Sequence, residues 1–459
     1  MVNLIFLFFT ATFLLSFNSL NVESGFDEKP NIVLILADDL TWRDIEPYGN
    51  PDVKTPNIQR LSKEGMTFHG MYTATAMCSP TRQQLYTGLY PVRSGAYPNH
   101  SWVYSGVKSM PHYLKQLGYK VGITGKHHFG PPDSYPFQEI GGQGGIDIKA
   151  VSEFVNGNAD QPFTLVVASD EPHKPWSMGS PEAYDPEELS VPDYLVDTPT
   201  TREQLTNYYG EITYLDQQVG EILAILEESG KSESTLVIFT TEQGGEFPFA
   251  KWTLYENGIK TGFIARWPGK ITANSEIEAL VQYVDIMPTL LEIADGNPQQ
   301  AETGVKDAFG NEGFDGRSFL PVLLGESSTF RDYVYGVHTL GILNAPEMYP
   351  IRSVSNGRYK FIKNLNAEAE FSNLTKRIDT NIRQSKKFFD PELIDAWFSA
   401  GEKSPNIAHR ANSYYERPQI ELYDLQKDPF ELNNLAGDPN YDQIVKKLDQ
   451  QLNRWMTQQ

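Results

Sequence analysis

Four short apolar runs, each followed at once by polar residues, constrain the fold of this chain more than any other feature. The runs are Asn31–Ala37, Tyr119–Thr124, Phe163–Ala168 and Thr235–Thr240. They are rich in β-branched residues and too short for buried helices, which is typical of strands that are covered on both faces of a mostly parallel sheet. The sequence therefore predicts an α/β fold. A helical period over residues 203–229, closed by Gly230, predicts one of the helices that cover the sheet.

Polar side chains follow each of these runs, where open α/β sheets place their sites. In chain order they are Asp38 and Asp39, then Lys126 and His128, then His173, and finally Glu242 and Gln243. Any one group taken alone could be a solvated turn. Adjacent aspartates repel one another, and burying them without a cation is costly. Carboxylate oxygens suit calcium or magnesium, so the four strand ends together predict a single cation-containing site.

The chain has one cysteine, Cys78, in the segment Cys78-Ser79-Pro80-Thr81-Arg82, which is followed by Thr87-Gly88. A lone cysteine is most often a small buried side chain, and it excludes an internal disulfide. The pattern from Pro80 onward predicts a helix whose N-terminus carries position 78. Free N–H groups and positive potential at a helix start favour an anion there.

The cysteine segment resembles the Cys-x-Pro-Ser/Thr-Arg motif of the formylglycine-dependent (type I) sulfatases, which belong to the alkaline-phosphatase-like superfamily. The resemblance runs from Asn31 to the C-terminal helix. Four segments are most similar to the sulfamidase (N-sulfoglucosamine sulfohydrolase) branch, which includes bacterial polysaccharide sulfatases: 125–131, 135–137, 348–354 and 363–366. The resemblance implies a large mixed, mostly parallel sheet sandwiched by helices, with a smaller C-terminal α+β lobe.

The resemblance also implies roles for the site residues. Cys78 would be converted by a formylglycine-generating or sulfatase-maturing enzyme to 3-oxoalanine (formylglycine), whose hydrate attacks sulfur. Four side chains would hold one calcium ion: Asp38, Asp39, Glu242 and Gln243. Five more residues would stabilise charge or transfer protons. Arg82 would hold the hydrate, and Lys126 and Lys251 would neutralise charge on the sulfuryl group. His173 would bind sulfate or protonate the leaving atom, and His128 would take the proton that is released when the aldehyde is restored.

The implied function is hydrolysis of sulfate esters of a sulfated polysaccharide or its oligosaccharides, with a marine algal polysaccharide such as ulvan favoured. His100 and Arg352 are the predicted substrate contacts. A net charge of −21 argues against nucleic acid as a partner. One alternative is a sulfamidase acting on N-sulfoglucosamine of heparan-type chains. A phosphoesterase of the same superfamily is disfavoured, because those enzymes use Ser or Thr as nucleophile.

One pair of residues departs from the family pattern. The family usually has Asp followed by Asn or His where this chain has Glu242-Gln243. Calcium tolerates the longer side chains better than magnesium does, because its coordination is more flexible. The departure leaves open a catalytically impaired protein that binds sulfated glycans.

Three parts are predicted along the chain. Residues 1–24 begin with an apolar run and are predicted to form a signal peptide, with an uncleaved membrane anchor as the alternative. A signal peptide implies a secreted or periplasmic protein without stable membrane insertion. Residues 25–330 form the catalytic domain. Residues 331–459 form a subdomain with a small antiparallel sheet and a terminal helix. Residues 68–75 are predicted as one strand, and residues 367–417 as a substrate-facing insertion or irregular surface.

Overall fold

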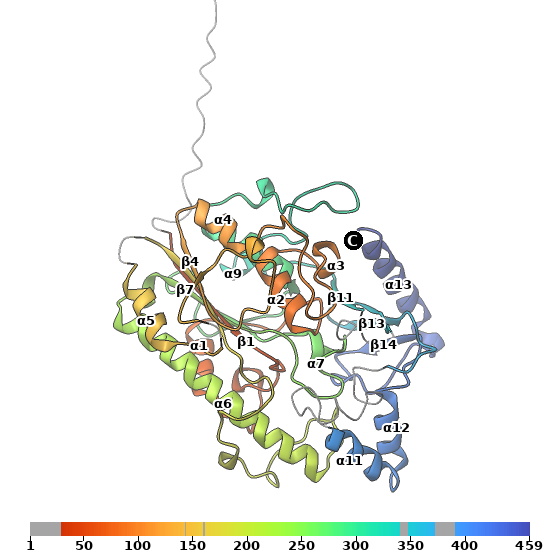
Figure 1. Cartoon of the computed structure of the whole chain (residues 1–459). Coiled ribbons are helices and arrows are strands. Elements are labelled where there is room, and N and C mark those ends of the chain that lie inside the picture. Colours follow the sequence, from red (N-terminus) through yellow and green to blue (C-terminus); the bar gives the residue numbers. More distant parts are fainter. Residues whose placement is uncertain (1–28, 143, 159–160, 340–347, 372–390) are drawn as a thin grey trace, which may run out of the picture.

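A large sheet lies between two layers of helices in the computed structural model, which describes residues 29–142, 144–158, 161–339, 348–371 and 391–459 (Figure 1). Its strand order is β5-β4-β6-β1-β7-β8-β2-β9. The four apolar runs are the adjacent, mutually parallel strands of its centre: β4 (Lys120–Gly125), β6 (Phe163–Ala168), β1 (Asn31–Ala37) and β7 (Thr235–Thr241). The predicted fold class is confirmed. The predicted signal peptide, residues 1–24, lies outside the described residues.

The sheet is mixed at one side. Strand β8 (Phe263–Arg266) runs antiparallel to β7 and to β2 (Met66–Phe68), and β9 (Ser275–Ile277) runs parallel to β2. At the other edge, β5 (Gln138–Glu139) pairs with β4.

The single strand predicted over residues 68–75 is wrong. Strand β2 ends at Phe68, and a separate strand, β3 (Met71–Tyr72), pairs with β10 (Val281–Gln282). Gly70 explains the break, because a Cβ atom there would lie 2.3 Å from the carbonyl oxygen of Ala279. The chain therefore bends at this close backbone contact and leaves the large sheet.

Alternate residues of β1 face two separate cores, which accounts for the unbroken apolar run. Val33 and Ile35 face the layer formed by α1 (Pro56–Glu64), α5 (Ile148–Asn156) and α6 (Pro199–Glu228). Ile32 and Leu34 face the layer formed by α2 (Cys78–Thr87), α4 (Met110–Gln116), α8 (Ile286–Ile293) and α9 (Leu320–Leu323). Figure 1 shows α6 and α4 on opposite sides of the strands. The helix predicted over residues 203–229 is confirmed as most of α6.

The register of the central strands brings their C-terminal ends level. Ala37 pairs with Thr241, and Ala168 pairs with both Leu36 and Gly125. The next residues along β1, β4 and β7 therefore leave the sheet at one edge. Gly125 makes this turn possible, since its φ is 82° and a Cβ atom would lie 2.1 Å from the carbonyl oxygen of Ala168.

The C-terminal lobe has its own antiparallel sheet, of β11 (Val334–His338), β12 (Ile351–Ser355), β13 (Tyr359–Asn364) and β14 (Ile420–Asp424). Helix α13 (Asp442–Met456) packs Leu448, Leu452 and Trp455 against it. The smaller α+β lobe is therefore confirmed, whereas its boundary at residue 331 stays a prediction.

The stretch 367–417 is more regular than predicted. It contains α11 (Pro391–Gly401) and α12 (Pro405–Ser413), while residues 372–390 lie outside the described part of the chain. Two further short helices are α3 (Pro91–Ser94) and α7 (Glu256–Ile259). In the described ranges, no helix has both the length and the apolar character needed to cross a membrane.

Candidate active site

Helix α2 begins at Cys78, as predicted, and ends before Gly88, which has a left-handed φ of 70°. All ten of its residues are buried. Cys78 and Arg82 lie four residues apart and so share one helix face. That face points at the strand ends, because the Cys78 Sγ atom lies 3.8 Å from Asp39 Oδ1 and the Arg82 guanidinium contacts Glu242.

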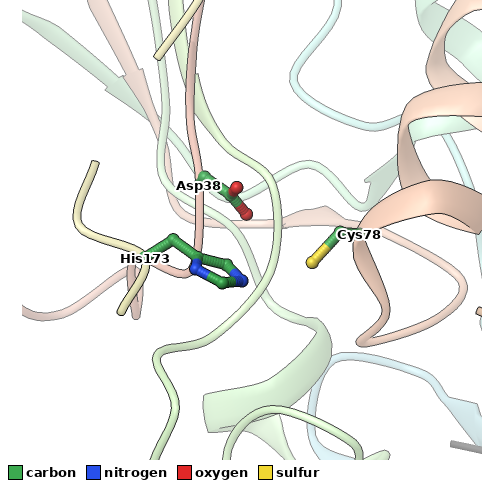
Figure 2. A group of neighbouring side chains, drawn as sticks. All are labelled: Asp38, Cys78 and His173. Atoms are coloured by element: carbon green, nitrogen blue, oxygen red, sulfur yellow. The ribbon is translucent and has the colours of Figure 1, made fainter. Parts of the chain in front are cut away.

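The residues predicted from separate strand ends converge on Cys78. Gln243 Nε2 lies 2.7 Å from Asp39 Oδ1 and 3.3 Å from the Cys78 sulfur. His173 Nε2 lies 3.6 Å from Asp39 Oδ2. Figure 2 shows Cys78 from α2 facing Asp38 and His173, whose ligand atoms and the sulfur all lie within 4.8 Å of one another.

Basic side chains pair with these carboxylates. Lys126 forms an ion pair with Asp38, and Lys251 forms one with Asp39. Arg82 Nη2 lies 2.9 Å from Glu242 Oε2 and 3.5 Å from Asp38 Oδ2. We call the following nine residues the charged cluster: Asp38, Asp39, Cys78, Arg82, Lys126, His173, Glu242, Gln243 and Lys251.

Two side chains of the charged cluster are partly exposed to solvent. The side chains of Lys126 and His173 are 16% and 18% exposed, whereas those of Arg82, Asp38, Asp39 and Lys251 are at most 2% exposed. Lys126 and His173 are therefore the side chains of the cluster that an approaching anionic group can contact from solvent.

Burial and the ion pairs act in opposite directions on the pKa values of the acidic groups in the cluster. Burial alone would raise the pKa of Asp38, but Lys126, His173 and Arg82 outweigh burial and hold that pKa well below its ordinary value. Burial raises the pKa of Glu242 well above its ordinary value, and the charge of Asp38 adds to this effect against the opposing effect of Arg82. The pKa of the Cys78 thiol is also raised, chiefly by burial. The unmodified thiol is therefore protonated and a poor nucleophile.

Three of the four predicted calcium ligands carry a buried oxygen without a hydrogen-bond partner. These oxygens are Asp38 Oδ1, Glu242 Oε1 and Gln243 Oε1. Orphaned buried oxygens are costly unless a donor or a cation meets them. Calcium binds carboxylate and amide oxygens, so these residues fit a calcium ion. The Arg82–Glu242 pair is compatible with this fit, because it engages only the other oxygen of Glu242.

Next to Lys126 lies a second group of side chains, His100, Trp102 and His128, which we call the aromatic rim. His128 Nε2 lies 2.9 Å from His100 Nδ1, and the ring centroids of His128 and Trp102 are 6.4 Å apart. Burial, together with Lys126 and Arg82, lowers the pKa of His128 to about 2. Burial, Lys126 and Lys251 also lower the pKa of His100. Both imidazoles are therefore neutral at neutral pH.

Two predicted roles are not tested by this geometry. The hydrogen bond described for His128 goes to His100, so its role in proton removal stays a prediction. Arg352 lies on β12, where Nη1 donates to the carbonyl oxygens of His338 and Ile351, both at 2.9 Å. Its contact with substrate likewise stays a prediction.

Glu246 was missed by the sequence reasoning. Both of its carboxylate oxygens are buried without a hydrogen-bond partner, and one lies within 4.8 Å of ligand atoms of Asp39 and His173. Burial raises the pKa of Glu246 to about 7. The sequence feature that could have identified Glu246 is its position three residues after Gln243, in the loop that follows β7.

Comparison with known families gives two matches. The family described as Sulfatase matches residues 30–296, and the family described as N-sulphoglucosamine sulphohydrolase, C-terminal, matches residues 245–382 and 409–458.

Relatives are similar over nearly the whole chain. An ulvan-active sulfatase of Formosa agariphila is 34% identical, covering 96% of this chain and 82% of the relative. The human N-sulphoglucosamine sulphohydrolase is 31% identical, covering 93% and 89%. A solved structure of a protein in complex with its substrate D-glucosamine-2-N,6-O-disulfate superposes with a TM-score of 0.68 at 19% identity, covering 94% of this chain and 98% of that one. The last similarity concerns the fold alone.

Proposed function

The chain belongs to the sulfatase family of hydrolases, and from this premise we propose that it removes sulfate esters from a sulfated polysaccharide or its oligosaccharides. One observation carries the proposal: Cys78, at the start of α2, meets Asp39 and Gln243 among paired lysines and a histidine. The ulvan-active relative supports an algal polysaccharide such as ulvan as the substrate.

Lys126 and Lys251 supply fixed positive charge in the cluster. Sulfate is a poor electrophile until fixed positive charge meets its oxygens. Burial alone would lower the pKa of Lys126 and of Lys251, but Asp38 and Asp39 outweigh burial and raise both pKa values above the ordinary range. Both ammonium groups are therefore charged and held in place before substrate arrives.

His173 can act through a defined atom. Its Nδ1 lies 2.5 Å from the carbonyl oxygen of Lys174, which fixes Nδ1 as the protonated nitrogen. Nε2 is then the atom that binds a sulfate oxygen or holds the proton for the leaving atom. Burial lowers the pKa of His173, whereas an incoming sulfate group favours its protonated form.

Two groups would complete the site. Calcium would be held by Asp38, Asp39, Glu242 and Gln243, and Cys78 would be converted to formylglycine by a maturing enzyme. When present, they supply a polarised sulfate oxygen and an oxygen nucleophile that the buried thiol does not offer. Export of the protein, to the periplasm or the medium, belongs to the same proposal.

A sulfamidase is the second candidate. The match of residues 245–382 and 409–458 to the C-terminal region of N-sulphoglucosamine sulphohydrolase favours it. The two candidates differ in the leaving atom, which is a sugar oxygen in one and a sugar nitrogen in the other.

The test is a panel of substrates for protein co-expressed with a formylglycine-generating enzyme. Mass spectrometry first establishes the aldehyde at position 78. Sulfate release is then measured from ulvan oligosaccharides, from N-sulfated and O-sulfated heparan disaccharides, and from an aryl sulfate. Release from ulvan oligosaccharides is the expected result, and exclusive release from N-sulfoglucosamine assigns the sulfamidase. No release from any substrate, with the aldehyde present, overturns the proposal in favour of a glycan-binding protein.

A further inference from the structure

The loop that carries the aromatic rim is tied directly to the helix of Cys78. Ser79 N lies 3.2 Å from Asn99 Oδ1, and Ser79 Oγ lies 3.0 Å from the carbonyl oxygen of Ser101. Gln83 Nε2 donates to the same carbonyl at 2.8 Å, and Gln83 Oε1 accepts from the Val103 amide at 3.0 Å. Ser79 and Gln83 are fully buried. Residues 99–103 are therefore held in a fixed position relative to Cys78.

Trp102 is the exposed side chain of this fixed loop. Its side chain is 45% exposed, although a side chain of this size is usually mostly buried. One part of the indole lies over Gly130, where an added Cβ atom would lie 3.0 Å from ring atom Cδ2. Glycine therefore lets the ring lie close to the backbone. The backbone supports the indole on that side, and nearly half of the side chain stays open to solvent.

Trp102 lies beside His128, close in sequence to Lys126, which is a partly exposed residue of the charged cluster. The indole is adjacent to His128, which follows Lys126 by two residues and is hydrogen-bonded to His100. Lys126 is one of the two side chains of the cluster that an approaching anionic group can contact from solvent. A sulfate group held by Lys126 would thus place the sugar that carries it beside the aromatic rim.

We propose that residues 99–103 form a sugar subsite in which the Trp102 indole stacks on the apolar face of a pyranose ring of the sulfated glycan. The inference rests on the proposed function and adds the residue that holds the sugar. A pyranose presents C–H groups on its faces and hydroxyl groups at its edge. The exposed indole offers an apolar surface, and beside it the exposed His100 keeps its Nε2 outside the bond to His128, where a hydroxyl group can pair with it.

The test compares Trp102→Ala with Trp102→Phe, and uses Phe309→Ala as the control. Phe309 is an exposed aromatic residue on a loop that lines another cavity, and it lies outside the aromatic rim. The first readout is calorimetric binding of a desulfated ulvan oligosaccharide, which needs no turnover. We expect Trp102→Ala to weaken this binding about 10-fold, Trp102→Phe to retain most of it, and Phe309→Ala to leave it unchanged.

The second readout distinguishes binding of the sugar from binding of the sulfate group. Inorganic sulfate is a small competitor that binds the charged cluster alone, so its inhibition constant should be the same in wild type and Trp102→Ala. The KM for the sulfated oligosaccharide should rise about 10-fold with kcat nearly constant. Equal glycan binding by wild type and Trp102→Ala overturns the subsite, as does a parallel loss of sulfate inhibition. Failure of the proposed function appears separately, as wild-type protein that binds the desulfated glycan and releases no sulfate.

Discussion

The charged cluster and the aromatic rim lie side by side but are built in different ways. The cluster comes from the ends of four central strands and from α2, and its carboxylates are paired with buried lysines and an arginine. The rim comes from two loops and contains two histidines with lowered pKa values and a half-exposed indole. The charged cluster keeps its fixed charges away from water, whereas the aromatic rim presents neutral groups to water.

This difference indicates a division of tasks. Fixed positive charge recognises a sulfate group whatever molecule carries it, whereas an apolar face with neutral nitrogens recognises a sugar. Changes in the charged cluster should therefore affect all substrates alike, and changes at His100 and Trp102 of the aromatic rim should affect the choice among them. Four predictions test or refine this comparison.

The largest effect is expected at the centre of the cluster. Cys78→Ala should reduce sulfate release at least about 10⁴-fold, equally for aryl sulfate and oligosaccharide, because on the proposed function position 78 supplies the nucleophile. Ion chromatography of released sulfate measures this loss, and circular dichroism checks the fold. Residual activity on one substrate class alone would contradict a cluster that serves every substrate.

The second effect concerns stability. Arg82→Met should lower the free energy of unfolding by about 3–5 kcal/mol, because Asp38 and Glu242 stay buried without their guanidinium partner. The matched control is Arg60→Met, which breaks ion pairs of a side chain that is 45% exposed and should cost less than about 1 kcal/mol. Urea denaturation measures both variants. Similar losses would show that burial does not distinguish the cluster from the surface.

The third effect concerns calcium. At about 100 times its dissociation constant, calcium should stabilise wild-type protein by about 2.7 kcal/mol. Gln243→Leu removes one orphaned oxygen and should reduce that increment. The control, Gln84→Leu, removes a buried glutamine whose Oε1 accepts from Thr73 and Ala74, and it should keep the increment despite lower stability. Urea denaturation with and without calcium measures the gain in the free energy of unfolding. An equal gain in wild type and Gln243→Leu would exclude this residue as a ligand.

The smallest effect concerns pH and the aromatic rim. The pKa of His128 in the folded protein, about 2, lies below the ordinary value of 6.5, so only the unfolded chain takes up a proton between these values. Stability that is present above pH 6.5 is therefore lost as the pH falls. The expected loss is about 2 kcal/mol between pH 6.5 and 5. His128→Gln should show a shallower pH dependence in denaturation curves, and an unchanged slope would contradict a neutral rim.

Much of the charged cluster could be predicted because it depends on local patterns. Apolar runs of strand length identified β1, β4, β6 and β7, and the parallel register then brought their following residues together. The pattern from Pro80 onward predicted a helix that carries position 78 at its N-terminus, and α2 confirms it. These features are encoded within short segments, so a single sequence reveals them.

The remaining features depend on contacts between distant segments. Arg82 and Glu242 are 160 residues apart, and no spacing indicates that they pair. The hydrogen bonds from Ser79 and Gln83 to the loop of Trp102 are equally invisible in the sequence. Gly70 divided a predicted strand because of the backbone of Ala279, some 200 residues away. Tertiary packing decided each of these cases.

The complete burial of α2 has a consequence for the order of events during biosynthesis. A maturing enzyme, if the proposed function holds, would have to bind the residues around Cys78, and in the folded protein all of them, from Cys78 to Thr87, are buried. On the proposed function, oxidation of the thiol must then precede folding, while the segment is still an extended chain. Protein that folds before the thiol is oxidised would retain an unmodified Cys78. The active fraction of a preparation would then be determined during synthesis.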